Sequence, residues 1–509
     1  MALLRTNSVT VLGSDTHLID VEIDRFSYAA SRPAKSRPHS WIWSWKPLLV
    51  AAAFLVLYTQ IVRPGVDWGD DWALYVAHAR NFATGHPYLD TGFLYSRLTA
   101  VSSPPSYPPV FPFLLSLVYR VRGFDLEAMK FLSCLAAALA VFLSGCYFRP
   151  KLGDRWTLVL MLLLGGTLAF LDTIGQLATH MMGIDLMLIC FLVDRAVRDR
   201  DWDRRRPLLA AVVLVIPVLI AIFTRASAAP LAAAVVVDDL WRRRRLTLFS
   251  AAFSGALAVL FVLISRVFPG GASYGDAWRM VPHLWTHSVY YAKWASYMWF
   301  NSFSTPLHFL TFAVCSVAAA AAFYRRVRQG PGIAEFFVVL HLGMLIVYPA
   351  GTALYYALPL ATLYCAYAIE GMLPLLRNRL LAAAAAAMLL AVPAGNLLHA
   401  DRSPFPGPGR PEYRVLLDAV RQDTSPGDRF LARKPRLFAL LSGRAAGFYV
   451  RTGDAQVFWS DVADRRIAYV VWHKGDPEDR QWLEPQLRRF PGRFALRYEN
   501  PEFALYAVR

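Results

Sequence analysis

The chain has 509 residues, 56% of them hydrophobic and 17% charged, with a mean hydropathy of +0.37 and a formal net charge of +17. Soluble domains carry about 25% charged residues, and here the apolar residues gather in long runs, so we predict a polytopic membrane protein and not a soluble one. The basic residues fall in short bursts between these runs instead of forming one patch, which argues against nucleic-acid binding and is typical of orientation signals.

Residues 1–46 are predicted to be a cytoplasmic tail. The first 40 residues are polar and mixed in charge, without the apolar stretch near the start that a cleavable signal peptide needs. All five cysteines lie in apolar runs and none lies in the polar C-terminal part, so no disulfide framework is expected. They are Cys134, Cys146, Cys190, Cys315 and Cys365.

Eleven segments qualify as candidate membrane spans, since a span takes about 20 mostly apolar residues. They are residues 47–62, 126–147, 156–172, 178–194, 207–223, 226–241, 246–267, 306–324, 333–350, 354–376 and 380–399. Together they form a predicted transmembrane core, residues 47–399.

Basic residues alternate along the connections between these segments. The basic connections are 148–155, 195–206, 242–245, 325–328 and 377–379, whereas the alternate short connections contain a single basic residue, Arg225. Because cytoplasmic loops are enriched in Lys and Arg, this pattern predicts eleven spans with the N-terminus inside. The loops 63–125 and 268–305 and the C-terminal part 400–509 then lie outside.

The segment YPPVFPFLLSLVYRVRG (107–123) is apolar but short and rich in proline at its start. Counting it as a span would reverse the side of every later basic loop. We therefore predict a re-entrant or interfacial helix.

The composition changes after residue 399. Residues 400–411 contain a proline-glycine linker, and beyond it helix-like stretches such as EYRVLLDAVRQ alternate with strand-like ones such as IAYVVW, FALRY and FALYAVR. Residues 412–509 are predicted to be a small extracytoplasmic α/β domain, of an ordinary size for a domain. It carries no metal or nucleophile motif, so we expect a structural or acceptor-facing role.

The first outer loop carries a resemblance to a known family. It opens with the acidic pair of WGDDW, continues with Tyr75, AHARN (77–81), Gly85 and Tyr88, and ends in SYPPVFPFLLSLVYRVRG (106–123). This order resembles the protein O-mannosyltransferase and aminoarabinose-transferase-like branch of the GT-C glycosyltransferases, over residues 45 to 380. The resemblance implies a GT-C-type helical fold, a polyprenyl-phosphate-linked sugar as donor and an acceptor on the outer face of the membrane.

The resemblance also implies roles for particular residues. Asp71 has the family's spacing to Tyr75 and Ala79, which favours it as the catalytic carboxylate. The family often has a second acidic residue directly after it, but this chain has Trp72 there and has Asp70 before it instead. Both acids are therefore catalytic candidates, and Tyr75 is a substrate-binding candidate.

Other matches are partial. FTRASAAPL (223–231) resembles the family segment with an arginine at the outer end of a span, and SYGDAW (273–278) resembles the start of the later outer loop. His180 stands where the family often has an acid, and Tyr355 lies in YPAGTALYYALP (348–359), where the family commonly has arginine. Part of the donor or acceptor site is thus expected to differ.

The expected chemistry needs a base and a cation. A carboxylate within about 3 Å of an acceptor hydroxyl can take its proton as the new bond forms, and inversion is expected for one base and one displacement through an oxocarbenium-like state. A guanidinium stabilises the charge that the departing phosphate gains, with Arg97 and Arg225 as candidates. No cofactor is expected; a divalent cation stays open as an alternative, although no motif indicates one.

Each assignment has a plainer alternative. Asp70 and Asp71 could be loop or cap acids, Arg225 could be an arginine that snorkels to the interface, His180 could be a satisfied polar contact, and Tyr355 could belong to an interfacial aromatic belt.

Two rival functions stay open. A transporter would need repeated halves and charges near the bilayer midplane; the predicted spans carry few charges, and Asp185 is the main exception. A catalytically inactive GT-C-like scaffold is the other, since the segment 348–359 departs from the family. The richness in arginine and alanine suggests a GC-rich bacterium, so the expected location is the bacterial inner membrane.

Overall fold

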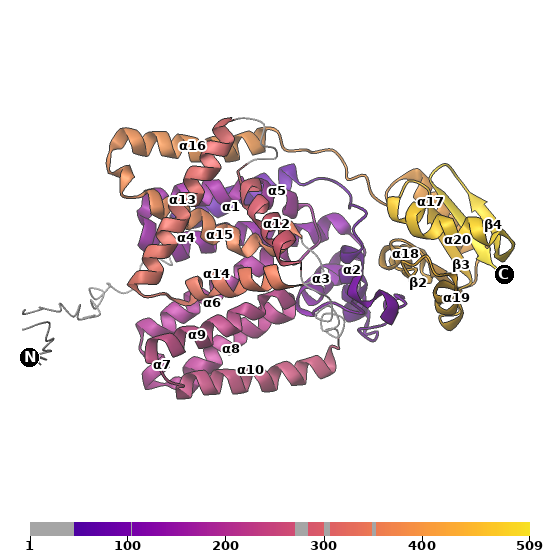
Figure 1. Cartoon of the computed structure of the whole chain (residues 1–509), viewed down its shortest axis with the longest axis horizontal. Helices are drawn as coiled ribbons and strands as arrows, with labels where there is room; N and C mark the ends of the chain where they lie inside the picture. The colour runs from indigo at the N-terminus through magenta and orange to yellow at the C-terminus, as the bar shows by residue number, and fades with distance from the viewer. Residues whose placement is uncertain (1–44, 103, 270–282, 300–305, 349–352) are drawn as a thin grey trace, which may run out of the picture. The chain divides into compact units, whose positions relative to one another are not determined.

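The computed structural model describes residues 45–102, 104–269, 283–299, 306–348 and 353–509 (Figure 1). The predicted cytoplasmic tail lies outside these residues except for its last two, and SYGDAW (273–278) lies outside them entirely. Residues 45–509 make up one unit by their internal contacts.

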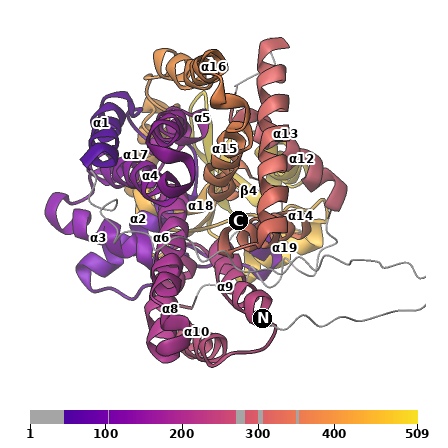
Figure 2. The same ribbon diagram turned by 90° about the vertical axis from the view of Figure 1, so that its left-hand side faces the viewer.

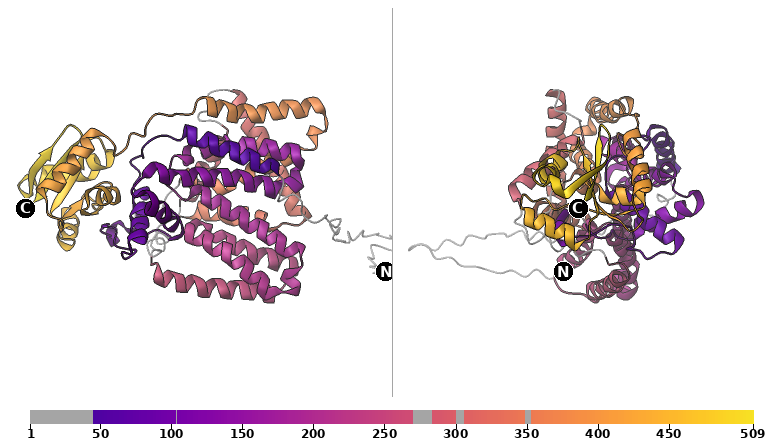
Figure 3. Two further views of the ribbon diagram at one scale, coloured as in Figure 1. Left: turned by 180° about the vertical axis from the view of Figure 1, so that it is seen from behind. Right: turned by 90° about the vertical axis from the view of Figure 1, so that its right-hand side faces the viewer.

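The described part of the chain up to residue 398 is built mainly of helices. The first are α1 (Trp45–Ile61), α2 (Asp71–Thr84), η1 (Arg97–Ser102), α3 (Val110–Arg122), α4 (Leu126–Gly165), α5 (Leu168–Ile174), α6 (His180–Asp199), α7 (Trp202–Arg205), α8 (Pro207–Thr224), η2 (Ala226–Ala228), α9 (Ala229–Arg243) and α10 (Leu248–Val267). The next are α12 (Leu284–Tyr297), α13 (Pro306–Gln329), α14 (Ile333–Val347), η3 (Leu354–Tyr356), α15 (Leu358–Met372), η4 (Leu375–Arg377) and α16 (Arg379–Leu398). Sequential helices pack side by side, for example α4 on α6 and α6 on α8, as the two turned views show (Figures 2 and 3).

Five of the described helices are long and apolar enough to cross a membrane, namely α4, α8, α10, α16 and the Phe309–Gln329 part of α13. The apolar helices α1 and α14 are shorter, with 17 and 15 residues. Each predicted span overlaps a described helix, but the count of eleven spans stays a prediction.

The long helix α4 covers parts of two predicted spans. It has 40 residues, but Gly153 inside it has φ 72° and ψ 170°, which is not helical. A side chain at such a positive φ would be strained, whereas glycine adopts it readily. The break falls in the predicted basic connection 148–155, so the chain turns there between the two predicted spans.

The two ends of the long helices have different surroundings. At one end, Arg198 of α6 lies 2.6 Å from Asp238 of α9, and Arg326 of α13 pairs with Glu335 of α14 and Glu370 of α15. The opposite ends of α6, α8, α9 and α14 line a single cavity. A helix of 20 residues such as α6 spans about 30 Å, so the basic connections and the cavity lie at opposite ends of the bundle.

The C-terminal part, residues 411–509, is described throughout and contains a mixed sheet (Figures 1 and 3). Its elements are α17 (Pro411–Asp423), β1 (Arg429–Leu431), α18 (Pro435–Ser442), β2 (Ala445–Gly447), α19 (Ala455–Asp464), β3 (Tyr469–His473), the π-helical turn η5 (Asp479–Leu483), α20 (Glu484–Arg489), η6 (Pro491–Arg493), β4 (Phe494–Glu499) and β5 (Phe503–Val508). The strand order is β2-β1-β3-β5-β4, with β1 parallel to β2 and β3 and the hairpin β4–β5 antiparallel. Asn500 closes that hairpin, because its Oδ1 accepts from the N–H of Glu502 and of Phe503.

The first outer loop adds a short segment to the edge of this sheet. Phe93 forms a parallel bridge with Ala446 of β2, with the Leu94 N–H donating to the Ala446 carbonyl (2.7 Å) and the Ala446 N–H donating to the Gly92 carbonyl (2.9 Å). Gly92 has φ 75°, and a Cβ there would meet the Cβ of Ala439 at 3.3 Å. The edge of β2 is therefore covered by the loop, which blunts an otherwise open strand edge.

Apolar residues of α2 and of the C-terminal part share one buried cluster. Trp72, Ala73 and Val76 of α2 pack in it with Phe438 of α18 and Leu505 of β5. At about 25 cal/mol for each Å² of apolar surface buried, such a cluster contributes several kcal/mol to the contact. The C-terminal part thus packs against α2 through one continuous hydrophobic cluster.

The predicted orientation has a direct test. Because the basic connections lie at the end of the bundle away from the cavity, reporter fusions at residues 150, 200, 243, 327 and 378 should all score cytoplasmic. Two or more fusions that score outside would contradict the eleven-span topology.

Candidate functional site

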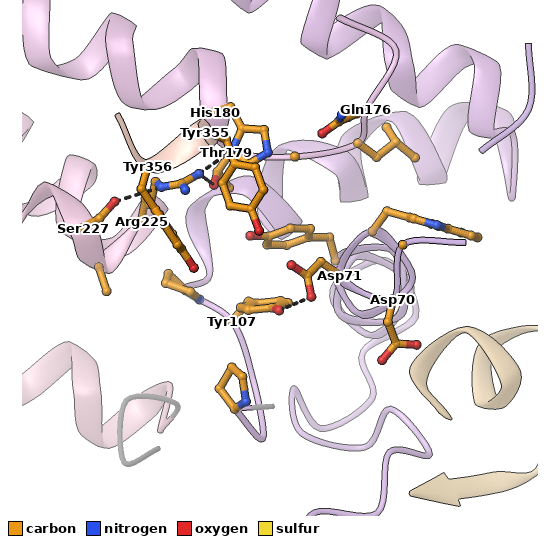
Figure 4. Close-up of a pocket in the computed structure, with 18 of the residues that line it drawn as sticks. Asp70, Asp71, Tyr107, Gln176, Thr179, His180, Arg225, Ser227, Tyr355 and Tyr356 are labelled. Carbon is orange, nitrogen blue, oxygen red and sulfur yellow. Dashed lines mark hydrogen bonds between the residues drawn. The ribbon is translucent and has the colours of Figure 1, made fainter. Parts of the chain in front are cut away.

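One cavity of about 680 Å³ lies where the membrane helices meet the C-terminal part (Figure 4). Its wall comes from the start of α2, residues 104–108, the turn before α6, the α8–η2 junction, the end of α14, η3 and the loops around β1 and β2. Ligand cavities of 300–1,000 Å³ are usual for small substrates. Among the residues predicted from the sequence, Asp70, Asp71, Tyr75, His180, Arg225 and Tyr355 line it.

Asp71 begins α2 and faces the cavity, with 61% of its side chain exposed. Its Oδ1 accepts the Tyr107 hydroxyl at 2.5 Å and Nη1 of Arg436 at 3.1 Å. Among the described residues none donates to Oδ2. One oxygen of this carboxylate is therefore fixed, and the other is available to a ligand in the cavity.

Asp70 points the other way, toward α18 (Figure 4). It is 8% exposed, and its Oδ1 accepts the Leu437 N–H at 2.9 Å, so it caps the first turn of α18 instead of capping its own helix. Burial raises the pKa of Asp70 to about 6, although Arg436 and the Leu437 N–H lower it. The two neighbouring acids thus have different surroundings.

The AHARN segment (77–81) of α2 makes hydrogen bonds with the loop that contains Tyr107. Nδ1 of His78 donates to the Tyr88 carbonyl (2.8 Å) and its Nε2 accepts the Tyr107 N–H (3.4 Å); burial lowers the pKa of His78 to about 4, which keeps Nε2 free to accept. Asn81 donates to the carbonyls of Pro87 and Asp90. The ring of Tyr107 stacks on that of Tyr75, with centroids 4.6 Å apart.

Arg225 lies on another wall of the cavity, between α8 and η2. Its Nε donates to Ser227 Oγ (2.8 Å) and its Nη1 to His180 Nδ1 (2.5 Å), and its guanidinium lies 4.9 Å from the ring centre of Tyr356. Tyr355 stacks on His180 with ring centroids 4.4 Å apart. Among the described residues none accepts from Nη2, so this N–H group is available to a ligand.

The Arg225–His180 contact also fixes a tautomer. A guanidinium can only donate, so Nδ1 of His180 accepts and any ring proton lies on Nε2. His180 is therefore neutral in this arrangement and adds no second positive charge beside Arg225.

Arg97 is not part of the cavity wall. It lies at the start of η1 and is exposed to solvent. Asp185, on which the transporter alternative depends most, is 4% exposed inside α6 and does not line the cavity either.

Several cavity residues have no counterpart among the sequence predictions. Arg433, Lys434, Arg436 and Arg451 come from the C-terminal part, and Tyr107 comes from the first outer loop. Tyr107 lies in the SYPPVFPF segment that carries the family resemblance, so its position was a usable signal. No local pattern marks the four cations, because only the seating of the C-terminal part brings them to the cavity.

A metal site is not indicated among the described residues, where no three His, Cys, Asp or Glu side chains converge as metal ligands. Asp70 and Asp71 converge on the guanidinium of Arg436 instead. A divalent cation between these carboxylates would face that positive charge, so the residues present do not fit one.

Comparisons with known proteins agree with the sequence resemblance. Residues 106–268 match the family model described as dolichyl-phosphate-mannose-protein mannosyltransferase, a segment that includes Tyr107, His180 and Arg225 but begins after the acid pair. No curated protein matches the chain.

Solved structures match over most of the chain. ArnT from Cupriavidus metallidurans bound to undecaprenyl phosphate is 14% identical, with a TM-score of 0.58 over 90% of this chain and 97% of that one. The Archaeoglobus fulgidus oligosaccharyltransferase tethered with an acceptor peptide is 10% identical, with a TM-score of 0.59 over 92% of this chain and 75% of that one. The resemblance predicted from the first outer loop is thereby confirmed: this chain has the fold of the GT-C superfamily of glycosyltransferases.

Proposed function

We propose that this protein is a membrane glycosyltransferase that moves a sugar from a polyprenyl-phosphate carrier to a hydroxyl of an outer-face acceptor, which can be a protein, a lipid or a glycan. The observation that carries the proposal is that one cavity combines a carboxylate with a free oxygen, on Asp71, and a guanidinium with a free N–H, on Arg225. Transfer from a donor of this class needs both the carboxylate and the guanidinium, because a proton leaves the acceptor while negative charge builds up on the phosphate. The matched ArnT structure contains undecaprenyl phosphate, which supports a lipid phosphate as donor.

Asp71 acts as the general base in this proposal. Its Oδ2 takes the proton of the acceptor hydroxyl as the acceptor oxygen bonds to the anomeric carbon. Tyr107 and Arg436 hold Oδ1, so the carboxylate keeps one orientation through the reaction. A fixed base loses less entropy in reaching the transition state than a rotating one.

Arg225 binds the phosphate of the donor. The bond between the anomeric carbon and the phosphate oxygen breaks, and its electron pair leaves with the phosphate. A guanidinium stabilises that growing charge most in the transition state. The Tyr355 and Tyr356 rings pack near this guanidinium, at 5.4 and 4.9 Å from the ring centres, and restrict the directions in which it can bond.

The stereochemistry follows from this arrangement. Asp71 and Arg225 come from different walls of the cavity, so the acceptor and the phosphate can occupy opposite faces of the sugar. A single displacement then inverts the anomeric centre. Purified protein incubated with a polyprenyl-phosphate sugar of defined anomeric configuration tests the function, and NMR of the product tests the inversion.

The donor itself can be identified in cells. Lipid-linked sugars should accumulate in a deletion strain, and their mass spectrum names the sugar and the carrier length. A strain with an unchanged lipid-linked sugar profile would contradict the donor class and favour the transporter or inactive-scaffold alternatives.

Replacing Arg225 with Ala should raise the KM for the lipid donor while the protein still folds and inserts. A charge-assisted bond to phosphate contributes about 1.5–3 kcal/mol, which corresponds to about a 10- to 100-fold loss at 1.4 kcal/mol per decade. Arg225→Lys should restore only part of the affinity for the lipid donor, because a point charge cannot reproduce bidentate bonding. Donor kinetics that are unchanged in the alanine variant would assign Arg225 to interfacial snorkelling instead.

A further inference from the structure

Arg436 is a buried cation that the C-terminal part inserts beside the acid pair. It lies in the first turn of α18, only 3% of the residue is exposed, and Asp71 precedes it by 365 residues. We infer that Arg436 is a positioning residue for the Asp71 carboxylate, so that the site is complete only when α18 is seated on α2. This inference rests on the function proposed above.

Both Nη atoms of Arg436 donate to the protein, whereas its buried Nε makes no hydrogen bond among the described residues. Nη1 donates to Asp71 Oδ1 (3.1 Å) and to the Tyr107 hydroxyl (2.9 Å), Nη2 donates to the Pro104 carbonyl (2.6 Å), and Nε lies 3.8 Å from Asp70 Oδ2. Its side chain is 2% exposed. The guanidinium is therefore a poor ligand for a substrate, in contrast to Arg225, whose Nη2 is open to the cavity.

The bonds of Arg436 instead form a closed set around one carboxylate oxygen. Tyr107 and Arg436 both bond to Asp71 Oδ1 and also to each other. Rotation of the Asp71 side chain would break two of these three bonds. The set thus holds Oδ1 away from the acceptor and leaves Oδ2 as the oxygen that meets the acceptor hydroxyl.

The position of α18 is fixed from two directions. Asp70 accepts the Leu437 N–H, next to Arg436 in the chain, and negative charge at a helix N-terminus is favourable. The loop segment around Phe93 pairs with β2, which directly follows α18, and the ring of Phe93 lies 4.9 Å from the Arg436 guanidinium. Asp70 therefore bonds to the backbone of the helix that contains Arg436, and Asp71 bonds to the Arg436 side chain.

The cost of burying this arginine is offset in part by its partners, since Nε alone among its nitrogens makes no hydrogen bond. A guanidinium out of water is costly unless it is paired and hydrogen-bonded, and here two carboxylates, a hydroxyl and a carbonyl surround it. Lysine could not replace it fully, since an ammonium group is a point charge without a planar fork. The complete set of bonds therefore needs the planar fork of arginine, and a positive charge alone reproduces only part of it.

The test uses the full-length protein in detergent and measures kcat and donor KM for Arg436→Met and Arg436→Lys. Misplacement of a reacting group by about 1 Å can cost about 100-fold, so Arg436→Met should lower kcat about 10- to 100-fold with little change in donor KM. Arg436→Lys should recover part of kcat.

Ser96→Ala is the matched control. Ser96 Oγ donates to Asp461 Oδ1 at 3.1 Å, so this variant removes another contact between the first outer loop and the C-terminal part without touching the acid pair. Its kcat and donor KM should equal those of the unmodified protein. Size-exclusion profiles and melting temperatures of all variants show whether the fold is kept.

A double variant separates this inference from the function on which it rests. If Arg436 acts through Asp71, the Asp71→Asn/Arg436→Met variant should be no slower than Asp71→Asn alone, because effects of groups that act as a unit do not add. Additive losses, a normal kcat in Arg436→Met, or a raised donor KM at normal kcat would each overturn the inference. Full activity in Asp71→Asn itself would overturn the proposed base, and that result does not depend on Arg436.

Discussion

Replacing Asp71 with Asn is expected to lower kcat about 10²–10⁴-fold, which is the usual cost of losing a general base. Asn keeps the shape of the side chain, and its Oδ1 can still accept the bonds from Tyr107 and Arg436. The amide has no oxygen basic enough to take the acceptor proton. Donor binding should change little, because the proposed phosphate contact, Arg225, belongs to another wall. Turnover and donor KM of the purified variant measure both effects.

Asp70→Asn is the natural partner of that experiment. Its Oδ1 can still accept the Leu437 N–H, and the change removes a buried charge, so most of the activity should survive. An inactive Asp70→Asn together with a normal Asp71→Asn would show that the order of the two acids is reversed. Normal activity in both would make the pair a polar contact only.

Replacing Arg198 with Met is expected to destabilise the protein by about 3–5 kcal/mol, the range for breaking a buried ion pair by removing one partner. Arg198 lies 2.9 Å from Asp194 and 2.6 Å from Asp238, whose side chains are 6% and 0% exposed. Without the guanidinium, Asp194 stays buried and loses the cation that bonds to it, whereas Asp238 keeps its hydrogen bonds from Nε of Arg242. The measurement is the melting temperature in detergent, with activity assayed well below it.

Arg205→Met controls for the loss of charge alone. Arg205 is 78% exposed and lies 3.9 Å from Asp201, and exposed pairs contribute at most about 1 kcal/mol. Equal melting temperatures for the Arg198 and Arg205 variants would mean that the cluster at the ends of α6 and α9 does not stabilise the bundle.

The sequence predicted the parts of this molecule that depend on local pattern. Apolar runs predicted segments that overlap the observed helices, because span length and hydrophobicity are properties of a short window. The spacing of Asp71 to Tyr75 and Ala79 selected the acid that faces the cavity, since α2 fixes these residues on one helix. Residues that a family pattern marks at helix ends, such as Arg225 and His180, also reached the cavity.

What the sequence did not predict depends on contacts between distant segments. The eight-residue helix α18 and the three-residue strand β2 are too short to show a hydrophobic periodicity in the sequence. A role for Arg436 can be recognised only from its contacts with Asp70 and Asp71. Arg97 was chosen for its charge within a long outer loop, but the loop turns it to solvent at η1. Residue type alone could not decide whether Arg97 or Arg225 would line the cavity.

The long separation between the acid pair and its arginine has a consequence for biosynthesis. The segment with Asp70, Asp71 and the apolar face around Trp72 leaves the ribosome 365 residues before Arg436 does. Until α18 emerges, the acids lack their cation and the apolar face of α2 lacks its cover. In a nascent chain the cavity wall therefore stays incomplete until α18 reaches α2. Chains that terminate before α18 expose both an acidic pair without this cation and an apolar surface on α2.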